Sequence, residues 1–110
     1  MRKNVYIGGE KVDRLDRRLL PGINVISLTF DMAHDHEFED LCTARSHITG
    51  EKINRFCHIH QSKEDLLKKQ EMTRLLCHRT GGCIQRCMGI DAMNALSVVT
   101  KLIDMKYDTN

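Results

Sequence analysis

The chain contains very few aromatic residues. Phe, Tyr and Trp together make up 5% of its 110 residues, and Trp is absent. Long apolar runs are absent as well, since none approaches the roughly 20 residues that cross a bilayer. The run Val5–Ile7 is also too short to be the apolar segment of a signal peptide. A core must therefore be built from Leu, Ile, Val and Met, and we expect no contact with a membrane.

Cysteine and histidine, by contrast, are concentrated in one region. All five cysteines and all six histidines lie between His34 and Cys87. An odd number of cysteines argues against a closed disulfide framework, and reduced cysteines are usual in the cytoplasm. Cys and His are also frequent ligands of transition metals. We therefore expect one cytoplasmic domain, residues 1–110, with Zn²⁺ as its candidate cofactor.

Charge is unevenly distributed, although the net charge is only +2. Residues 1–30 contain six basic and three acidic residues, residues 31–47 contain one and five, and residues 48–80 contain seven and four. So small a net charge does not by itself indicate a nucleic-acid partner. The two basic blocks are compatible with a solvated surface or with a contact surface for a polyanion.

The N-terminal third is expected to contain strands. Val5–Ile7 followed by Gly8-Gly9 predicts a short strand and a turn. Residues 23–30 include several β-branched side chains in an alternating apolar and polar pattern, which predicts a second strand. Residues 11–20 lie between them and are compatible with either a strand or a helix.

The rest of the chain is expected to be mainly helical. Residues 35–45 predict a helix with acidic first turns. Ser62 predicts the N-cap of a helix that reaches Arg79 and is ended by Gly81-Gly82. Residues 53–60 remain undecided between helix and strand. A stripe at helical spacing predicts a further helix over residues 84–105, and it consists of Met88, Ala92, Ala95, Leu96, Val99, Leu102 and Ile103. The expected fold is α+β, with a small N-terminal β-hairpin or sheet followed by a C-terminal half of three to four helices.

The same C-terminal stripe permits two further interpretations. With Gly89 as a turn and Asp91 as a cap, residues 81–100 can form a helix-turn-helix whose second helix exposes Asn94, Ser97 and Lys101. Gln85 weakens this interpretation, because a small residue normally stands there, and a single continuous helix explains the pattern equally well. The stripe could also pack against its twin in a homodimer.

The cysteines and histidines suggest two alternative metal sites. The first consists of Cys77, His78, Cys83 and Cys87, where the last two are four residues apart and share one face of a helix. The second consists of His34, His36, His58 and His60, whose pairs would each face one way on a strand. A site that joins Cys57 and His60 to Cys83 and Cys87 is disfavoured, because the helix between them would separate the pairs by about 25 Å unless the flanking segments folded back.

No catalytic motif is present. The sequence has no phosphate loop, no dinucleotide fingerprint and no nucleophile elbow. We therefore predict a non-enzymatic regulatory protein that binds nucleic acid, with a structural zinc ion as a candidate. The alternatives are an adaptor or inhibitor that binds a protein through its Met- and Leu-rich helices, and a small metal-dependent enzyme or metal sensor. The predicted nucleic-acid contacts are Arg14, Arg17, Arg18, Lys68, Lys69, Arg74, Arg79, Asn94, Ser97 and Lys101.

Overall fold

The fold combines two small antiparallel hairpins with helices, which confirms the α+β class. A computed structural model describes residues 5–109. The elements in chain order are β1 (Val5–Ile7), β2 (Glu10–Val12), α1 (Leu20–Asp31), the 3-10 helix η1 (Met32–His34), α2 (Glu39–Cys42), β3 (Thr43–Arg45), β4 (Lys52–Asn54), the 3-10 helix η2 (Arg55–Cys57), α3 (Lys63–Thr80) and α4 (Cys87–Tyr107).

The predicted N-terminal strand and turn are confirmed. β1 and β2 pair in an antiparallel register in which Val5 faces Val12 and Ile7 faces Glu10. Gly8 and Gly9 connect them with φ angles of 57° and 85°, a conformation that glycine adopts without steric cost. A second hairpin, β3–β4, forms a separate two-stranded sheet.

The strand predicted over residues 23–30 is wrong, because this segment is part of helix α1. Pro21 lies in the first turn of that helix, where its missing N–H is not needed. Val25, Leu28, Thr29 and Met32 are buried or half-buried, and their spacing of i, i+3, i+4 and i+7 is that of one helical face. Packing of this face overrode the β propensity of the branched residues.

The helix predicted over residues 35–45 is largely wrong as well. Only Glu39–Cys42 is helical, and Thr43–Arg45 leaves it as a strand that pairs with Lys52–Asn54. The acidic residues at its start are present as predicted, but the hairpin partner, which local sequence does not reveal, ends the helix after one turn.

Helix α3 confirms the prediction for residues 62–79. The side chain of Ser62 accepts a hydrogen bond from the backbone N–H of Asp65, and the Asp65 carboxylate accepts one from the Ser62 N–H, so the two form a capping box. Gly81 ends the helix in the left-handed conformation, with φ of 74°.

Helix α4 runs without a break from Cys87 to Tyr107. The turn that a helix-turn-helix requires at Gly89 is not formed, because Gly89 lies inside the helix and its N–H bonds to the carbonyl of Arg86. The continuous-helix interpretation is therefore confirmed, and the helix-turn-helix interpretation is wrong. Within residues 5–109, no helix is long and apolar enough to cross a membrane.

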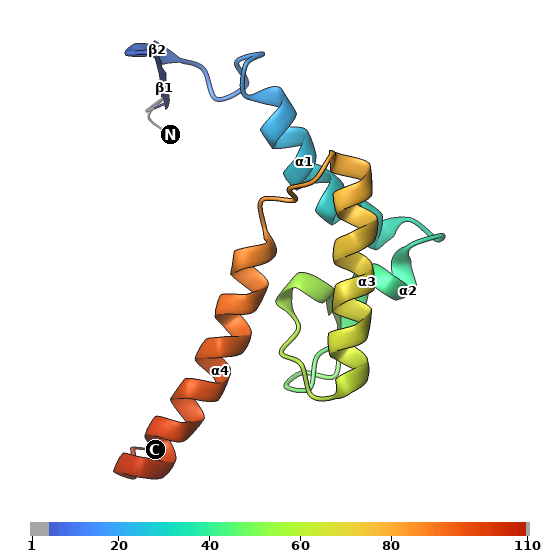
Figure 1. The fold of residues 1–110 in the computed structure, drawn as a ribbon, viewed down its shortest axis with the longest axis vertical. Coiled ribbons are helices and arrows are strands. Elements are labelled where there is room, and N and C mark those ends of the chain that lie inside the picture. Colours follow the sequence, from blue (N-terminus) through green and yellow to red (C-terminus); the bar gives the residue numbers. More distant parts are fainter. Residues whose placement is uncertain (1–4, 110) are drawn as a thin grey trace.

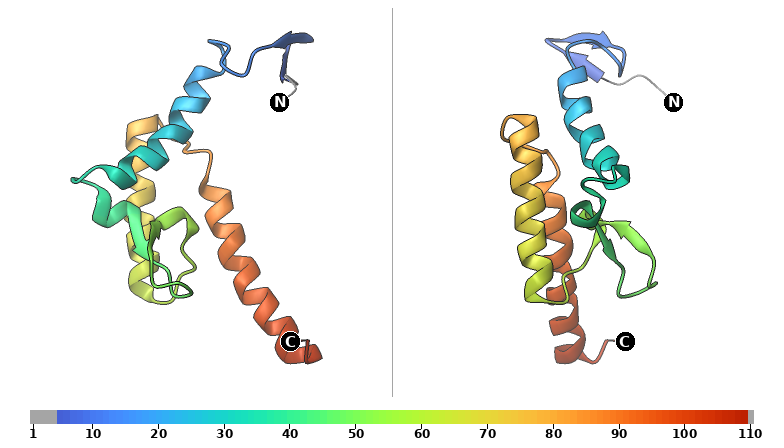
Figure 2. Two further views of the ribbon diagram at one scale, coloured as in Figure 1. Left: turned by 180° about the vertical axis from the view of Figure 1, so that it is seen from behind. Right: turned by 90° about the vertical axis from the view of Figure 1, so that its right-hand side faces the viewer.

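The buried core lies where α1, η2, α3 and the start of α4 meet (Figure 1). Figure 2 shows that η2 and the loop after it lie between α3 and α4, which run in opposite directions, while the β1–β2 hairpin lies apart beyond α1. The radius of gyration is 17.4 Å, whereas a compact chain of this length has about 13 Å. The main core cluster consists of Met32, Ala33, Cys42, Phe56, Met72, Leu76, Ile84 and Ile90.

The apolar stripe of α4 faces away from this core. Met88 is 81% exposed, Leu96 is 62% exposed and Ile103 is 46% exposed, whereas Ile90, on the other side of the helix, is 1% exposed. Helix α1 also exposes apolar side chains, including Ile23 and Phe30. Apolar surface of this extent is uncommon on a protein that functions alone.

Candidate functional site

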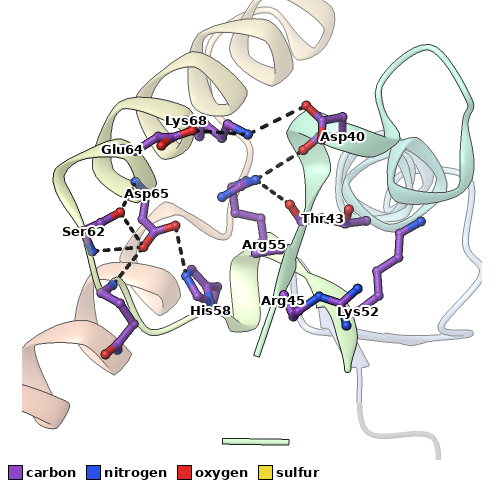
Figure 3. Close-up of a pocket in the computed structure, with 12 residues that line it drawn as sticks. Asp40, Thr43, Arg45, Lys52, Arg55, His58, Ser62, Glu64, Asp65 and Lys68 are labelled. Atoms are coloured by element: carbon purple, nitrogen blue, oxygen red, sulfur yellow. Dashed lines mark hydrogen bonds and ion pairs between the residues drawn. The ribbon is translucent and has the colours of Figure 1, made fainter. Parts of the chain in front are cut away.

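A polar pocket of about 500 Å³ opens between the β3–β4 hairpin and the start of α3 (Figure 3). Its lining is almost entirely charged or polar. The lining residues are Asp40, Thr43, Ala44, Arg45, Lys52, Arg55, His58, Gln61, Ser62, Glu64, Asp65 and Lys68.

Arg55 lies at the centre of this pocket and holds its hairpin wall in place. The side chain is buried, and its Nε donates to the carbonyl oxygen of Leu41 at 2.6 Å. Its Nη2 donates to the carbonyls of Asp40 and Thr43. These carbonyls lie at the C-terminal end of α2, where a cation is electrostatically favoured. Burial lowers the pKa of Arg55, and the charge of Asp65 opposes that shift.

His58 and Asp65 form the second feature of the pocket, on its α3 side. The His58 ring is buried, and its Nε2 lies 3.2 Å from a carboxylate oxygen of Asp65. The contact is not aligned as a hydrogen bond, so neither ring nitrogen has a well-aligned partner. Burial by itself would raise the pKa of Asp65, but the Gln61 N–H, the Ser62 side chain and His58 together lower it to about 2. The carboxylate is therefore ionised at neutral pH.

A side chain of α4, that of Asn94, fixes the loop that carries His58. The amide of Asn94 donates to the carbonyl of His58 at 3.2 Å, and its oxygen accepts from the backbone N–H of His60 at 2.7 Å. His60 points toward a second pocket of about 470 Å³, which Ser97 and Lys101 also line. Burial, together with the nearby charge of Lys69, lowers the pKa of His60.

The cysteines predicted as ligands occupy two different environments. Cys83 is exposed in the segment before α4, and Cys87 is half-buried as the first residue of that helix. Cys77 is packed against the core from α3, and His78 is exposed on the same helix. All five cysteines are free thiols. Among residues 5–109, no three His, Cys, Asp or Glu side chains gather as a metal site.

The predicted four-histidine site is also not assembled within the described part of the chain. His34 and His36 are exposed near the end of η1, while His58 and His60 lie in the loop before α3. The rings of His58 and His60 are 6.1 Å apart and nearly perpendicular. The chain does fold back along α3, because η2 and the His58–His60 segment contact α4. This fold-back is the exception that the sequence-based distance estimate allowed, and among residues 5–109 no metal site forms there.

The residues predicted to contact nucleic acid do not form one surface. Several are engaged within the chain: Arg18 pairs with Asp16 and Glu10, and Lys69 pairs with Asp91. Asn94 holds the loop before α3, as described above. Lys68 lies 3.8 Å from carboxylate oxygens of both Asp40 and Glu64, Arg79 stacks on Phe38, Arg14 has a partner within the chain, and Arg17 and Arg74 are exposed.

Sequence reasoning missed Arg55 and the role of Asp65 as a pocket residue. The signal for Asp65 was present, since Ser62 and Asp65 have the spacing of a capping box. Arg55 carried no local signal, because its partners lie twelve to fifteen positions earlier in the chain.

Comparison with known proteins identifies the class of protein. The family model described as 4-hydroxyphenylacetate 3-hydroxylase N terminal matches residues 1–110. The chain belongs to this family.

Two particular relatives are close. The 4-hydroxybutyryl-CoA dehydratase/vinylacetyl-CoA-Delta-isomerase of Clostridium aminobutyricum is 45% identical over 108 residues, which are 96% of this chain and 22% of the relative. A solved structure of an oxygen-tolerant archaeal 4-hydroxybutyryl-CoA dehydratase from N. maritimus matches with a TM-score of 0.87 and 45% identity, over 94% of this chain and 21% of that one. The chain thus spans about a fifth of the length of each.

These findings correct the functional prediction. Relatives this similar are enzymes, so a nucleic-acid-binding transcription regulator with a structural zinc ion is wrong, and so is the expectation of a non-enzymatic protein. A chain can contain no catalytic motif and still belong to an enzyme when the reacting groups come from several regions of a longer polypeptide.

Proposed function

We propose that this chain is a part of a dehydratase that acts on 4-hydroxybutyryl-CoA or a closely related 4-hydroxyacyl thioester. The observation that carries the proposal is 45% identity to a named dehydratase over 96% of the chain. The structural match, with a TM-score of 0.87, supports it independently of the alignment. On this proposal the pocket around Arg55 and the loop fixed by Asn94 are parts of the scaffold that present this region to the rest of the enzyme.

The test is a mass-spectrometric assay of the full-length protein that contains this chain. Incubation with 4-hydroxybutyryl-CoA is expected to give a product lighter by one water. Incubation with vinylacetyl-CoA is expected to give an isomer of unchanged mass and a different retention time. Butyryl-CoA, which lacks the hydroxyl group, is the control and should remain unchanged. If neither 4-hydroxybutyryl-CoA nor vinylacetyl-CoA is converted, the proposal is contradicted.

A second candidate activity is hydroxylation of a phenol, which the description of the matching family favours. The same protein would then add one oxygen atom to 4-hydroxyphenylacetate when dioxygen and a reductant are supplied. The dehydratase proposal predicts no such product. The two assays therefore separate the activity named for the two relatives from the activity in the description of the family.

We also propose that the rest of the enzyme covers the apolar stripe of α4. The stripe is exposed here although Leu96 and Val99 are typical core residues, and about four-fifths of the length of the relatives lies outside this chain. A homodimer contact through the same stripe is the alternative. Crosslinking from Val99→Cys to the same polypeptide supports the first arrangement, whereas crosslinking between two copies supports the second.

Cys83 and Cys87 are proposed as two thiolate ligands of a metal site. Their donor set fits, because both are free thiols four residues apart, Cys83 exposed and Cys87 half-buried. No third ligand reaches them within residues 5–109, so the remaining ligands must come from outside the chain. Two thiolates suit zinc or an iron–sulfur cluster, either of which supplies a Lewis-acidic or redox-active centre. Elemental analysis of the full-length protein identifies the metal, and loss of that metal from Cys83→Ser and Cys87→Ser checks the ligands.

Free cysteines throughout the chain favour a reducing compartment. We therefore propose that the enzyme works inside the cell.

A further inference from the structure

The segment that joins α3 to α4 is irregular. It contains Cys83 and leads directly to Cys87, and these are the two proposed thiolate ligands. Gly81 and Gly82 begin it with φ angles of 74° and 133°, and Gln85 adopts φ of 59°. A positive φ is uncommon for a residue with a side chain. Such a conformation persists only where the surrounding contacts hold it, so the neighbours of Gln85 decide the geometry of the pair.

Two contacts hold this segment against the core and against α1. Ile84 is 1% exposed and belongs to the core cluster. The amide of Gln85 lies over Gly22 of α1, where an added Cβ would meet its Nε2 at 3.4 Å. Cys83 is left facing outward between these anchors.

The strongest contact is made by Arg86, directly before Cys87. Its guanidinium carbon lies 4.2 Å from the ring centre of Phe30 and 4.3 Å from that of Phe56. Its Nη1 donates to the hydroxyl of Thr29 at 2.7 Å. That hydroxyl in turn donates to the carbonyl of Ile26 at 2.6 Å. A cation between two aromatic rings is attracted to both faces, so this one side chain joins α1, η2 and the start of α4.

Arg86 also lacks a carboxylate partner. Within residues 5–109 it takes part in no ion pair, although it is half-buried. Burial lowers its pKa. The faces of Phe30 and Phe56 are the partners that hold the guanidinium in place of a carboxylate.

We propose that Arg86 is the positioning residue of the Cys83–Cys87 pair: held by Phe30, Phe56 and Thr29, it fixes the segment so that both thiols are presented together. The inference rests on the proposed metal site, and it goes further by assigning a residue that does not touch the metal.

The experiment uses the full-length protein and two substitutions of the same residue. Arg86→Gln removes the charge and the stacking plane, and Arg86→Lys keeps the charge alone. Metal per chain is measured by elemental analysis, and loss of metal to a chelator is followed over time. Arg86→Gln is expected to lose metal about tenfold faster or more, as is usual when a group that orients metal ligands is removed. Arg86→Lys should give an intermediate rate.

Arg79 provides a matched control. It stacks on a single ring, that of Phe38, at 4.5 Å, and it lies on the exposed side of α3. Arg79→Gln should retain metal at the wild-type rate. If Arg86→Gln does not fold, Phe30→Leu replaces it, because that ring is 49% exposed and its loss removes one half of the stack. Phe30→Leu is then expected to lose metal faster than wild type.

The outcomes separate this inference from the proposed metal site. Wild-type metal retention in Arg86→Gln, or in Phe30→Leu where that variant is needed, together with metal loss in Cys83→Ser, would overturn the role of Arg86 and leave the ligands in place. Full metal retention in Cys83→Ser and Cys87→Ser would overturn the metal site itself.

Discussion

The core junction and the outer part of α4 contain similar side chains in opposite environments. At the junction, Leu76, Ile84 and Ile90 are almost completely buried, whereas Leu96 and Ile103 of α4 are about half exposed or more. The buried and the exposed side chains lie in helices α3 and α4 or, for Ile84, just before α4. Sequence patterns assign all of these positions to a core. The comparison shows that an apolar stripe identifies a face suited to burial without specifying its partner, which for α4 we propose to be the rest of the enzyme.

The largest expected effect is at the junction itself. Leu76→Ala removes a side chain that is 0% exposed, and it should lower the free energy of unfolding by about 2–5 kcal/mol, because it creates a cavity that cannot collapse. Denaturant unfolding of the full-length protein measures the change. Leu67→Ala, at a half-exposed position of the same helix, is the control and should cost much less. Equal costs would show that the junction is not the core.

The stripe of α4 is expected to give the next largest effect. Leu96→Ala in the full-length protein should lower the free energy of unfolding by about 2 kcal/mol, if other parts of the enzyme cover the side chain. Lys101→Ala, an exposed position on the same helix, should change it little. Should both variants match the wild type in a thermal melt, the stripe is solvent-exposed in the complete protein as well.

Loss of the α3 cap should have a smaller effect. Ser62→Ala removes the acceptor for the Asp65 N–H, and it should destabilise the protein by about 1 kcal/mol. The midpoint of chemical denaturation measures this. Ser27→Ala serves as the control, since Ser27 donates only to the exposed side chain of Asp31. A midpoint unchanged in Ser62→Ala would mean that water replaces the cap.

The smallest effect concerns pH. Since the pKa of His60 is lowered from 6.5 by burial, the unfolded state takes up a proton at a higher pH than the folded state does. Stability that is present above pH 6.5 is therefore lost as the pH falls below it. His60→Gln should show a weaker loss between neutral and mildly acidic pH, measured by urea midpoints at each pH. His47→Gln, an exposed position, should keep the wild-type dependence.

Sequence patterns predicted the parts of the fold that depend on local signals. Gly8-Gly9 marked the first turn, and Ser62 with Gly81 marked both ends of α3. Helix α1 could not be predicted from its β-branched residues, because the packing of Thr29 and Met32 decides its conformation. The stripe of α4 was predicted correctly as a helix, but its exposure could not be known.

The functional residues divide in the same way. Cys83 and Cys87 were found from their spacing alone, and they remain the proposed ligands. Arg55 and Arg86 could not be found, because their hydrogen-bond partners lie far from them in the sequence. Arg86, for example, donates to Thr29, which lies 57 positions earlier. The charge and spacing of residues along the chain do not predict that the Arg86 side chain stacks between the rings of Phe30 and Phe56.

Asn94 pairs α4 with the loop at His58–His60 through hydrogen bonds of the kind that otherwise set the register of strands in a sheet. Its amide donates to the carbonyl of His58 and accepts from the N–H of His60, which is how one residue of a parallel strand pairs with its neighbour. The side chain thus stands in for a peptide group of an absent strand. Its neighbours Met93 and Ala95 cannot both donate and accept, so a shift of α4 by one residue would break both bonds. A single amide therefore gives a helix a strand-like register, and Asn94→Asp, which loses the donor, is expected to weaken it.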